Sequence, residues 1–197
     1  MRIGFLGKTG AGKTSLVNAL FGLEFRTGNY QATTMALQRS TVTLTVSGRR
    51  VPVQVVDTPG LAESVETEPG YRRLYADLLP DLDHVVWVVA AHPRTFRADQ
   101  EALIALRPAF PAGVAVTVAL TRADTIGPND WDVANGRPSP GQRESLDQQV
   151  ANVLAKFGPY VASLRPADIV PCAAPRGYGL DHLIARIGAA LQAPERT

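Results

Sequence analysis

The residue types best suited to chemistry stand together near the start of the chain. Residues 7–14 read Gly-Lys-Thr-Gly-Ala-Gly-Lys-Thr and fit the pattern G-x-x-x-x-G-K-[S/T], between an apolar run and a helix-forming segment. Glycines there let backbone N–H groups converge on phosphates, and the start of the following helix adds a positive dipole. We expect Lys13 to contact the outer phosphates and Thr14 to bind Mg²⁺. The predicted cofactor-binding residues of this segment are Thr9, Gly10, Ala11, Gly12, Lys13, Thr14 and Ser15.

Two further segments favour the same site. Asp57 opens Asp-Thr-Pro-Gly directly after an apolar run, where a carboxylate can hold Mg²⁺ and the Gly60 N–H can meet a terminal phosphate. Thr34 lies in a polar stretch between the two motifs and would complete the Mg²⁺ shell. The alternatives are a plain Pro-Gly turn and a threonine that only leads into a strand. The predicted catalytic set is Lys13, Thr34 and Gly60, and the metal set is Thr14, Thr34 and Asp57.

The later part of the chain holds residues suited to reading a base. Asp124 ends Thr121-Arg122-Ala123-Asp124 after an apolar run, and its carboxylate can accept two hydrogen bonds from the edge of guanine. Adenine offers no such pair of donors. The stem of Arg122 would cover one face of the base, and after Cys172 the Ala173 N–H would meet the guanine oxygen. We therefore add Thr121, Arg122, Asp124, Cys172 and Ala173 to the predicted nucleotide-binding residues.

The elements that must position these residues alternate along the chain. Apolar runs at 3–6, 51–56, 85–89 and 114–120 predict buried strands, with a short last strand at 169–170. Helices are predicted at 13–21, 71–79, 99–106, 142–157 and 180–191. This alternation is typical of a parallel sheet covered on both faces. Polar and apolar residues alternate over 40–46 before a turn at 47–49, which predicts a hairpin and one antiparallel edge strand.

Length and composition favour one ordinary α/β domain. The chain has 197 residues, of which 45% are hydrophobic and 19% charged, and we expect a single domain over 1–197. The proline- and glycine-rich stretch 125–141 lacks periodicity, so we interpret it as an insertion loop. A formal charge of +2 gives no sign of a nucleic-acid or membrane partner. A single cysteine and no signal-peptide pattern indicate a cytoplasmic protein.

In order and spacing, these segments resemble the five G motifs of the translation-factor-related GTPases, especially their Era-like and septin-like branches. The resemblance spans nearly the whole chain and implies a P-loop NTPase fold of the Ras-like G-domain type. That fold is α/β, with a mostly parallel six-stranded sheet, one antiparallel edge strand and helices on both faces. The insertion, with Trp131 and Gln142, further resembles Era-like GTPases from bacterial prophage regions. The implied cofactors are GTP or GDP with Mg²⁺.

Departures from the family pattern shape the functional hypothesis. Thr121 and Arg122 stand where Asn and Lys are commoner, and Leu61 stands where Ras-like proteins place a water-orienting glutamine. We therefore expect slow GTP hydrolysis, accelerated by an unidentified protein partner or by self-association across the nucleotide face. A non-hydrolysing binding or self-assembly module is the first alternative. A P-loop ATPase or small-molecule kinase is the second, and it would leave Asp124 without a role.

Overall fold

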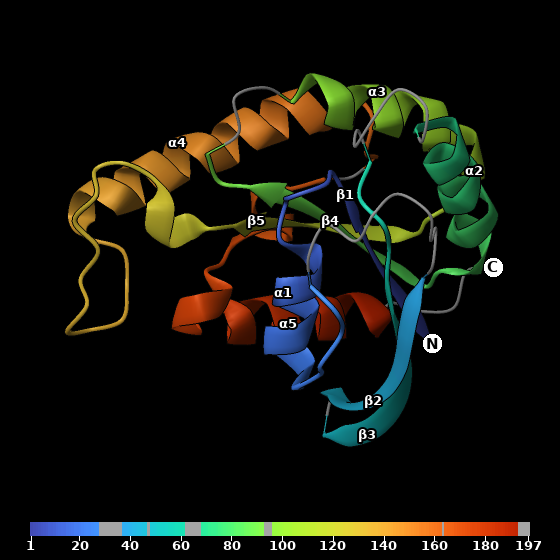
Figure 1. Ribbon diagram of the computed structural model, residues 1–197, viewed down its shortest axis with the longest axis horizontal. Coiled ribbons are helices and arrows are strands. Elements are labelled where there is room, and N and C mark those ends of the chain that lie inside the picture. The colour runs from blue at the N-terminus through green and yellow to red at the C-terminus, as the bar shows by residue number, and fades with distance from the viewer. Residues whose placement is uncertain (28–36, 47, 62–67, 93–95, 163, 193–197) are drawn as a thin grey trace.

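A computed structural model describes residues 1–27, 37–46, 48–61, 68–92, 96–162 and 164–192. Six strands form one sheet in the order β2-β3-β1-β4-β5-β6 (Figure 1). All neighbouring strands are parallel except β2 and β3. The predicted fold class is therefore confirmed. The strands are β1 (Arg2–Gly7), β2 (Gln38–Val46), β3 (Arg49–Asp57), β4 (His84–Ala90), β5 (Ala115–Thr121) and β6 (Ile169–Pro171).

Helices cover both faces of the sheet. They are α1 (Lys13–Phe21), α2 (Glu68–Leu78), α3 (Arg97–Leu106), α4 (Pro140–Phe157) and α5 (Leu180–Leu191). Apolar residues of α2, α3 and α4 pack on one face, around the fully buried Trp87 of β4. Those of α1 and α5 pack on the other face, around Phe5 and Val86. Because β1 and β4 are buried on both faces, they read as continuous apolar runs rather than as alternating strands.

The β2–β3 hairpin carries one polar residue to the site. Its antiparallel register pairs Val46 with Arg49 at the turn and Gln38 with Asp57 at the far end. The alternating sequence of β2 fits an edge strand with one buried face, and its last buried residues, Leu44 and Val46, join the core on the α1 and α5 side. The hairpin thus sets Gln38 beside the carboxylate predicted to bind metal.

The predicted insertion loop ends earlier than the sequence analysis placed it. Helix α4 begins at Pro140, so residues 140 and 141 are helical rather than part of a loop up to 141. The Ser139 hydroxyl accepts the Gln142 N–H, and the Gln142 side chain bonds back to the Ser139 N–H. Ser-Pro-Gly-Gln is a capping-box sequence with proline at the first helical position, so the sequence itself carries the signal for a helix start at Pro140.

Candidate functional site

The glycine-rich loop between β1 and α1 leaves backbone N–H groups at the start of the helix. Gly10 and Gly12 have φ angles of 75° and 88°, a left-handed conformation that glycine adopts without strain. The first hydrogen bond at the start of α1 runs from Leu16 N–H to the Gly12 carbonyl. In the hydrogen bonds found among the described residues, the Gly10, Gly12 and Thr14 N–H groups do not donate. Such a set of N–H groups without partners at a helix start is of the kind that binds phosphates in proteins.

Not every backbone group of the predicted set points outward. The Thr9 N–H donates to the Leu61 carbonyl (2.9 Å), and the Ala11 N–H donates to the Lys8 carbonyl (3.2 Å). Both bonds shape the loop itself. Ser15, the last residue of that set, is exposed in the first turn of α1. The Thr9 and Ala11 N–H groups are therefore used within the chain, and the nucleotide contact of Ser15 stays a prediction.

Lys13 projects back across the loop. Its side chain is buried, and Nζ donates to the carbonyls of Gly7 (3.0 Å) and Lys8 (2.9 Å). These contacts hold a positive charge at the rim of the N–H groups described above. A desolvated ammonium held in this way forms strong charge-assisted hydrogen bonds with an anion.

Thr14 and Asp57 meet at the same place. The Thr14 hydroxyl donates to Asp57 Oδ2 at 2.6 Å, and Gln38 Nε2 lies 3.5 Å from the same oxygen. The other oxygen, Oδ1, is buried and has no hydrogen-bond partner among the described residues. Burial raises the pKa of Asp57, while the Thr14 hydrogen bond and Lys13 partly offset the rise. A buried carboxylate oxygen without a partner beside a hydroxyl fits a hard divalent cation such as Mg²⁺.

A short contact holds the segment after β3 against the glycine-rich loop. Leu61 N–H donates to the Gly7 carbonyl (3.1 Å), and Leu61 O accepts the Thr9 N–H. A Cβ built on Gly60 would overlap the backbone and hydroxyl oxygen of Thr9. Only glycine therefore fits at position 60, because any side chain would push the two loops apart. Leu61 itself is buried in the core beside α2.

Tyr75 of α2 connects this segment to β1. Its hydroxyl lies 2.7 Å from Thr58 Oγ1 and from the Pro59 carbonyl, and it accepts the Gly7 N–H at 3.3 Å. The Tyr75 side chain is fully buried. Sequence reasoning missed this residue, because a tyrosine in a helix pattern carries no signal for a contact 68 residues away.

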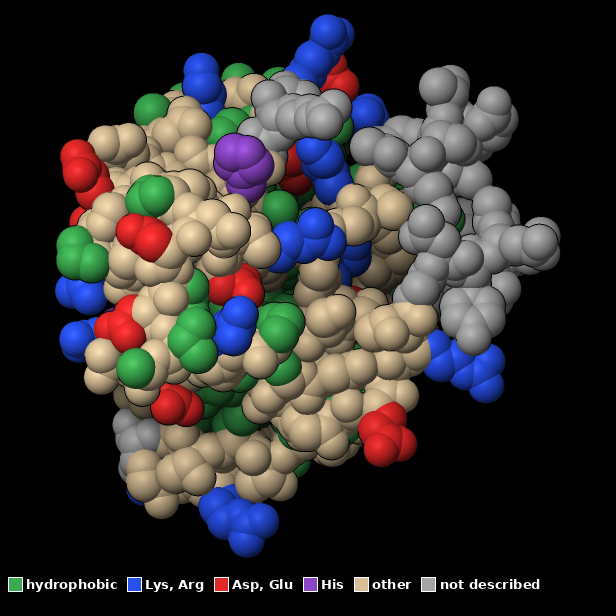
Figure 2. All heavy atoms as spheres, turned by 60° about the vertical axis from the view of Figure 1, so that its left-hand side comes forward, with side chains coloured by type: hydrophobic (Ala, Val, Ile, Leu, Met, Phe, Trp, Pro, Cys, Tyr) green, Lys and Arg blue, Asp and Glu red, His purple; other side chains and the backbone are tan. Residues whose placement is uncertain are grey.

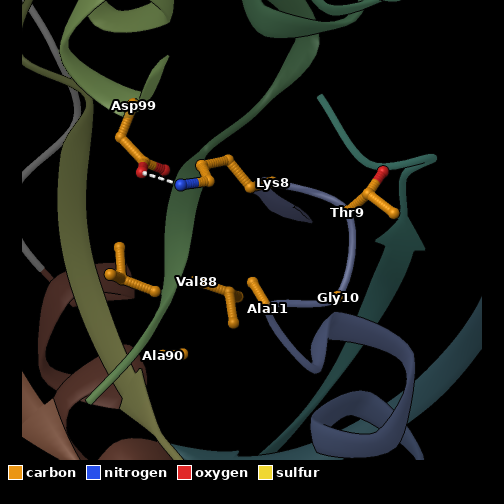
Figure 3. Close-up of a pocket in the computed structure, with 8 residues that line it drawn as sticks. Lys8, Thr9, Gly10, Ala11, Val88, Ala90 and Asp99 are labelled. Carbon is orange, nitrogen blue, oxygen red and sulfur yellow. Dashed lines mark ion pairs between the residues drawn. The ribbon is translucent and has the colours of Figure 1, made fainter. Parts of the chain in front are cut away.

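A second missed feature lies beside the loop, toward α3. Lys8 Nζ is 3.7 Å from Asp99 Oδ2, and the Trp87 indole N–H donates to Asp99 Oδ1 at 3.2 Å. Burial raises the pKa of Asp99, and Lys8 and Trp87 lower it in part. The pair borders a cavity of about 180 Å³ between the loop, the end of β4 and the start of α3 (Figure 3). The Lys8–Asp99 ion pair anchors the glycine-rich loop to α3.

Two side chains of the predicted base-reading motif support the glycine-rich loop. The Thr121 hydroxyl is buried and lies 2.6 Å from the Ala11 carbonyl. Arg122, the one described non-glycine residue with positive φ (58°), donates from Nη2 to the Gly10 carbonyl at 2.8 Å. Thr121 therefore holds the loop rather than reaching toward a base. The Arg122 contact places its side chain beside Gly10.

Asp124 stands at the end of this segment, next to the loop after β6. The Ala123 N–H donates to the Cys172 carbonyl (3.1 Å), which ties the two loops together. Asp124 Oδ2 lies 3.5 Å from Arg176 Nε, with the Asp124 and Arg176 side chains 15% and 45% exposed. The carboxylate that the sequence analysis assigned to guanine thus faces an arginine from the neighbouring loop.

The Ala173 N–H, predicted to meet a guanine oxygen, is already bonded within the chain. It donates to the Tyr178 carbonyl at 2.9 Å and is not available to a base. Among the described residues, the next N–H, that of Ala174, has no hydrogen-bond partner and opens a short 3-10 turn. The preceding Cys172 is fully buried, and burial raises its thiol pKa to about 12. Of these two neighbouring N–H groups, only that of Ala174 is free to donate to a ligand.

The remaining predicted residue, Thr34, lies outside the described residues.

Figure 2 turns the left-hand side of Figure 1 forward, with the loops at the start of α4. Lys and Arg side chains on that face are interspersed with acidic ones. In the part of the chain that the structure describes, no helix combines the length and apolarity needed to cross a bilayer.

Sequence comparison identifies the family of this arrangement. The model of the family described as 50S ribosome-binding GTPase matches residues 2–122, more than half of the chain. YfjP, an uncharacterized protein of Escherichia coli K12, is 37% identical over 98 residues, covering 50% of this chain and 33% of its own. YeeP of the same organism, also uncharacterized, is 31% identical over 119 residues, covering 59% and 47%. The match thus spans less than half of either relative.

Solved structures share the fold. A probable GTP-binding protein engB superimposes with a TM-score of 0.69 and 17% identity, over 98% of this chain and 100% of its own. Toc33 from Arabidopsis thaliana, in complex with Mg²⁺ and GMPPNP, has a TM-score of 0.69 and 19% identity, over 97% and 84%. Aquifex aeolicus Era bound to GDP·AlF₄⁻ has a TM-score of 0.68 and 20% identity, over 98% and 57%. Identities this low support the fold alone.

Proposed function

Because the chain belongs to the family of 50S ribosome-binding GTPases, we propose that it is a guanine-nucleotide switch that hydrolyses GTP slowly to GDP and phosphate with Mg²⁺. The match covers only 33% of YfjP and 47% of YeeP. The partners of the whole protein are therefore proposed as well. A ribosomal partner is suggested only by the family's description. The closer likeness to prophage-region GTPases, the single domain over 1–197 and the cytoplasmic location remain predictions.

The observation that carries the proposal is the contact between Thr14 and Asp57. The glycine-rich loop and the end of β3 are 43 residues apart, yet they bring a hydroxyl and a carboxylate within 2.6 Å of each other. Asp57 Oδ1 is buried without a partner in the described part of the chain. Lys13 and the N–H groups at the start of α1 stand beside this pair. A metal-bound phosphate chain matches this combination of donors, charge and carboxylate better than a neutral ligand.

The roles follow from what each group can do. Thr14 and Asp57 would hold Mg²⁺, which when bound neutralises charge on the outer phosphates. Lys13 would add a fixed positive charge, and the N–H groups of Gly10, Gly12 and Thr14 would orient the phosphate oxygens. The Gly60 N–H is proposed to meet the terminal phosphate.

Specificity for guanine would rest on two adjoining loops. Asp124 can accept from the N1–H and N2–H₂ groups of guanine, and the Ala174 N–H can donate to its carbonyl oxygen. The Ala123–Cys172 hydrogen bond holds these loops side by side. Buried or paired polar groups of this kind discriminate strongly against a base that leaves them unpaired.

A non-hydrolysing binding module is the second candidate. Its specific support is Leu61, a residue that is 1% exposed and whose backbone N–H and carbonyl are both hydrogen-bonded. That position offers no polar group to orient a water. Nucleotide would then stabilise a surface for a protein partner or for self-association.

One experiment separates the candidates. Purified protein is titrated with GDP, GTP and ATP, with and without Mg²⁺, and phosphate release is then followed. We expect Mg²⁺-dependent binding of GTP, no competition by ATP, and turnover on the order of 10⁻⁴ to 10⁻² s⁻¹. Binding without phosphate release favours the second candidate, whereas competition by ATP contradicts guanine specificity.

The protein concentration tests for self-association. The single-turnover rate should rise with concentration if a second copy completes the site across the nucleotide face. A rate above about 1 s⁻¹ that does not change with concentration contradicts a slow intrinsic switch.

A further inference from the structure

The residue after the Asp57–Gly60 motif offers no group to orient the attacking water. Leu61 is buried, its N–H donates to the Gly7 carbonyl at 3.1 Å, and its own carbonyl accepts the Thr9 N–H at 2.9 Å. Backbone hydrogen bonds and core packing hold the Leu61 side chain in place, so it does not turn toward the bound phosphates. If this chain hydrolyses GTP, another group must do this work.

Thr9 carries a hydroxyl next to Gly60. Its Oγ1 is buried, and it is the one buried hydroxyl in the described part of the chain without a hydrogen-bond partner. Buried polar groups in folded proteins are nearly always paired, so a lone one indicates a ligand, a water or a catalytic role. The nearest landmark is Gly60, because a Cβ added there would overlap Thr9 Oγ1.

The setting of this hydroxyl separates it from the other groups of the loop. In Figure 3 the Thr9 side chain points away from the Lys8–Asp99 ion pair. Its oxygen faces Gly60, the residue whose N–H is assigned to the terminal phosphate. The Thr9 backbone is held by the bond to Leu61, so the hydroxyl is placed by a fixed loop.

We propose that Thr9 is a catalytic residue, whose hydroxyl donates to an oxygen of the terminal phosphate and accepts a hydrogen bond from the attacking water. The inference rests on the proposed GTPase function. Water oxygen forms a bond to the γ-phosphorus while the bond from phosphorus to the β–γ bridging oxygen breaks. The electron pair of that bond leaves with GDP, and the water's protons pass to phosphate and solvent. Thr9 gains and loses no proton overall, because a hydroxyl donates and accepts at once.

Two substitutions test the hydroxyl. Thr9→Val keeps the β-branched shape and removes the oxygen, and Thr9→Ser keeps the oxygen. The matched control is Thr43→Val, an exposed threonine on β2 that pairs with Pro52. Thermal melting and GDP affinity establish that each variant is folded and binds nucleotide.

The first measurement needs no hydrolysis. The ratio of the affinities for GMPPNP and GDP reports contacts made only by the third phosphate. Thr9→Val should lower this ratio by about 10-fold, the typical value of a hydrogen bond to a charged group. Thr9→Ser and Thr43→Val should leave it within about 3-fold of the unchanged protein.

The second measurement is the single-turnover rate of GTP hydrolysis. Thr9→Val should slow it by about 10- to 100-fold, the typical range for loss of one positioned donor, and Thr9→Ser should retain it. An unchanged affinity ratio and rate in Thr9→Val would overturn the inference and leave the proposed function intact, since Oγ1 would then hold only a structural water. Faster hydrolysis in Thr9→Val also overturns it. Failure of the unchanged protein to bind guanine nucleotide would overturn the proposed function, and this inference with it.

Discussion

Arg176 Nε lies 3.5 Å from Asp124 Oδ2, so the carboxylate assigned to guanine already faces a guanidinium from the adjoining loop. Guanine contains the same planar arrangement of N–H donors around one carbon. The two would compete for the same carboxylate oxygens.

Replacing this arginine should therefore tighten nucleotide binding. Exposed ion pairs contribute up to about 1 kcal/mol, so Arg176→Gln should raise GDP affinity by no more than about 5-fold. The gain should shrink in high salt, because salt screens the pair that is removed. Titration calorimetry at two salt concentrations measures both, with Arg107→Gln, an exposed arginine after α3, as the control. Weaker binding by Arg176→Gln would instead mean that Arg176 contacts the nucleotide.

Asp124→Asn should exchange the base preference. The amide can donate to the C2 oxygen of xanthine, whereas it can no longer accept both guanine donors. Affinity for GTP should fall by at least about 10-fold, and affinity for xanthosine triphosphate should rise relative to it. Competition binding with the two nucleotides measures the ratio. An unchanged ratio would remove Asp124 from the site.

Lys13→Ala and Thr14→Ala should fail in different ways. Loss of the Lys13 charge should cost about 2–3 kcal/mol of triphosphate binding, because the contact is desolvated and charge-assisted. Thr14→Ala should mainly raise the Mg²⁺ concentration needed for binding, because the ion would lose the hydroxyl proposed to hold it beside Asp57. Nucleotide titrations across a Mg²⁺ series separate the two effects. Near-normal binding by both variants would contradict the assignment of the loop.

The Lys8–Asp99 pair should stabilise the fold. Lys8→Met would leave the buried Asp99 carboxylate without its cation. We expect the free energy of unfolding to fall by about 2 kcal/mol, less than for a fully buried pair because Lys8 is part-exposed. Asp99→Asn keeps an acceptor for the Trp87 indole. The double variant should lose less than the sum of the single variants, which urea unfolding of all four proteins measures. Strict additivity would show that the two side chains do not interact.

His84 should make stability depend on pH. It is fully buried at the start of β4, beside Arg186 and Asp168, and both ring nitrogens lack partners among the described residues. Burial, with Arg186, lowers its pKa from 6.5 to about 4. The neutral ring therefore favours the folded state fully above pH 6.5, and this contribution is lost as pH falls toward 4.

The loss should reach about 2 kcal/mol between pH 7.5 and 5. His84→Leu cannot titrate and should unfold with a correspondingly flatter pH dependence over that range. Urea unfolding at the two pH values measures the difference between the proteins. Equal slopes would mean that His84 is accessible to protons in the folded state.

The sequence by itself determined the elements and the order of the motifs. Continuous apolar runs predicted the parallel strands because β1 and β4 are buried on both faces, and the alternation in β2 predicted the edge hairpin. The motif Gly7–Thr14 carries its own spacing, so the placement of Lys13 and Thr14 at a helix start could be predicted without a fold. Each of these patterns depends only on residues that are neighbours in the chain, so it can be recognised in the sequence without knowledge of the fold.

Only the tertiary structure decided how the loops meet. The Thr9–Leu61, Tyr75–Pro59 and Lys8–Asp99 contacts join segments far apart in the chain, and no periodicity or motif encodes such pairs. The hydrogen bond that occupies the Ala173 N–H has the same cause. Which N–H stays available after β6 depends on the Tyr178 carbonyl, brought back by the turn before α5. Hydrogen bonds between distant loops depend on how the sheet brings strand ends together, and that geometry exists only once the chain has folded.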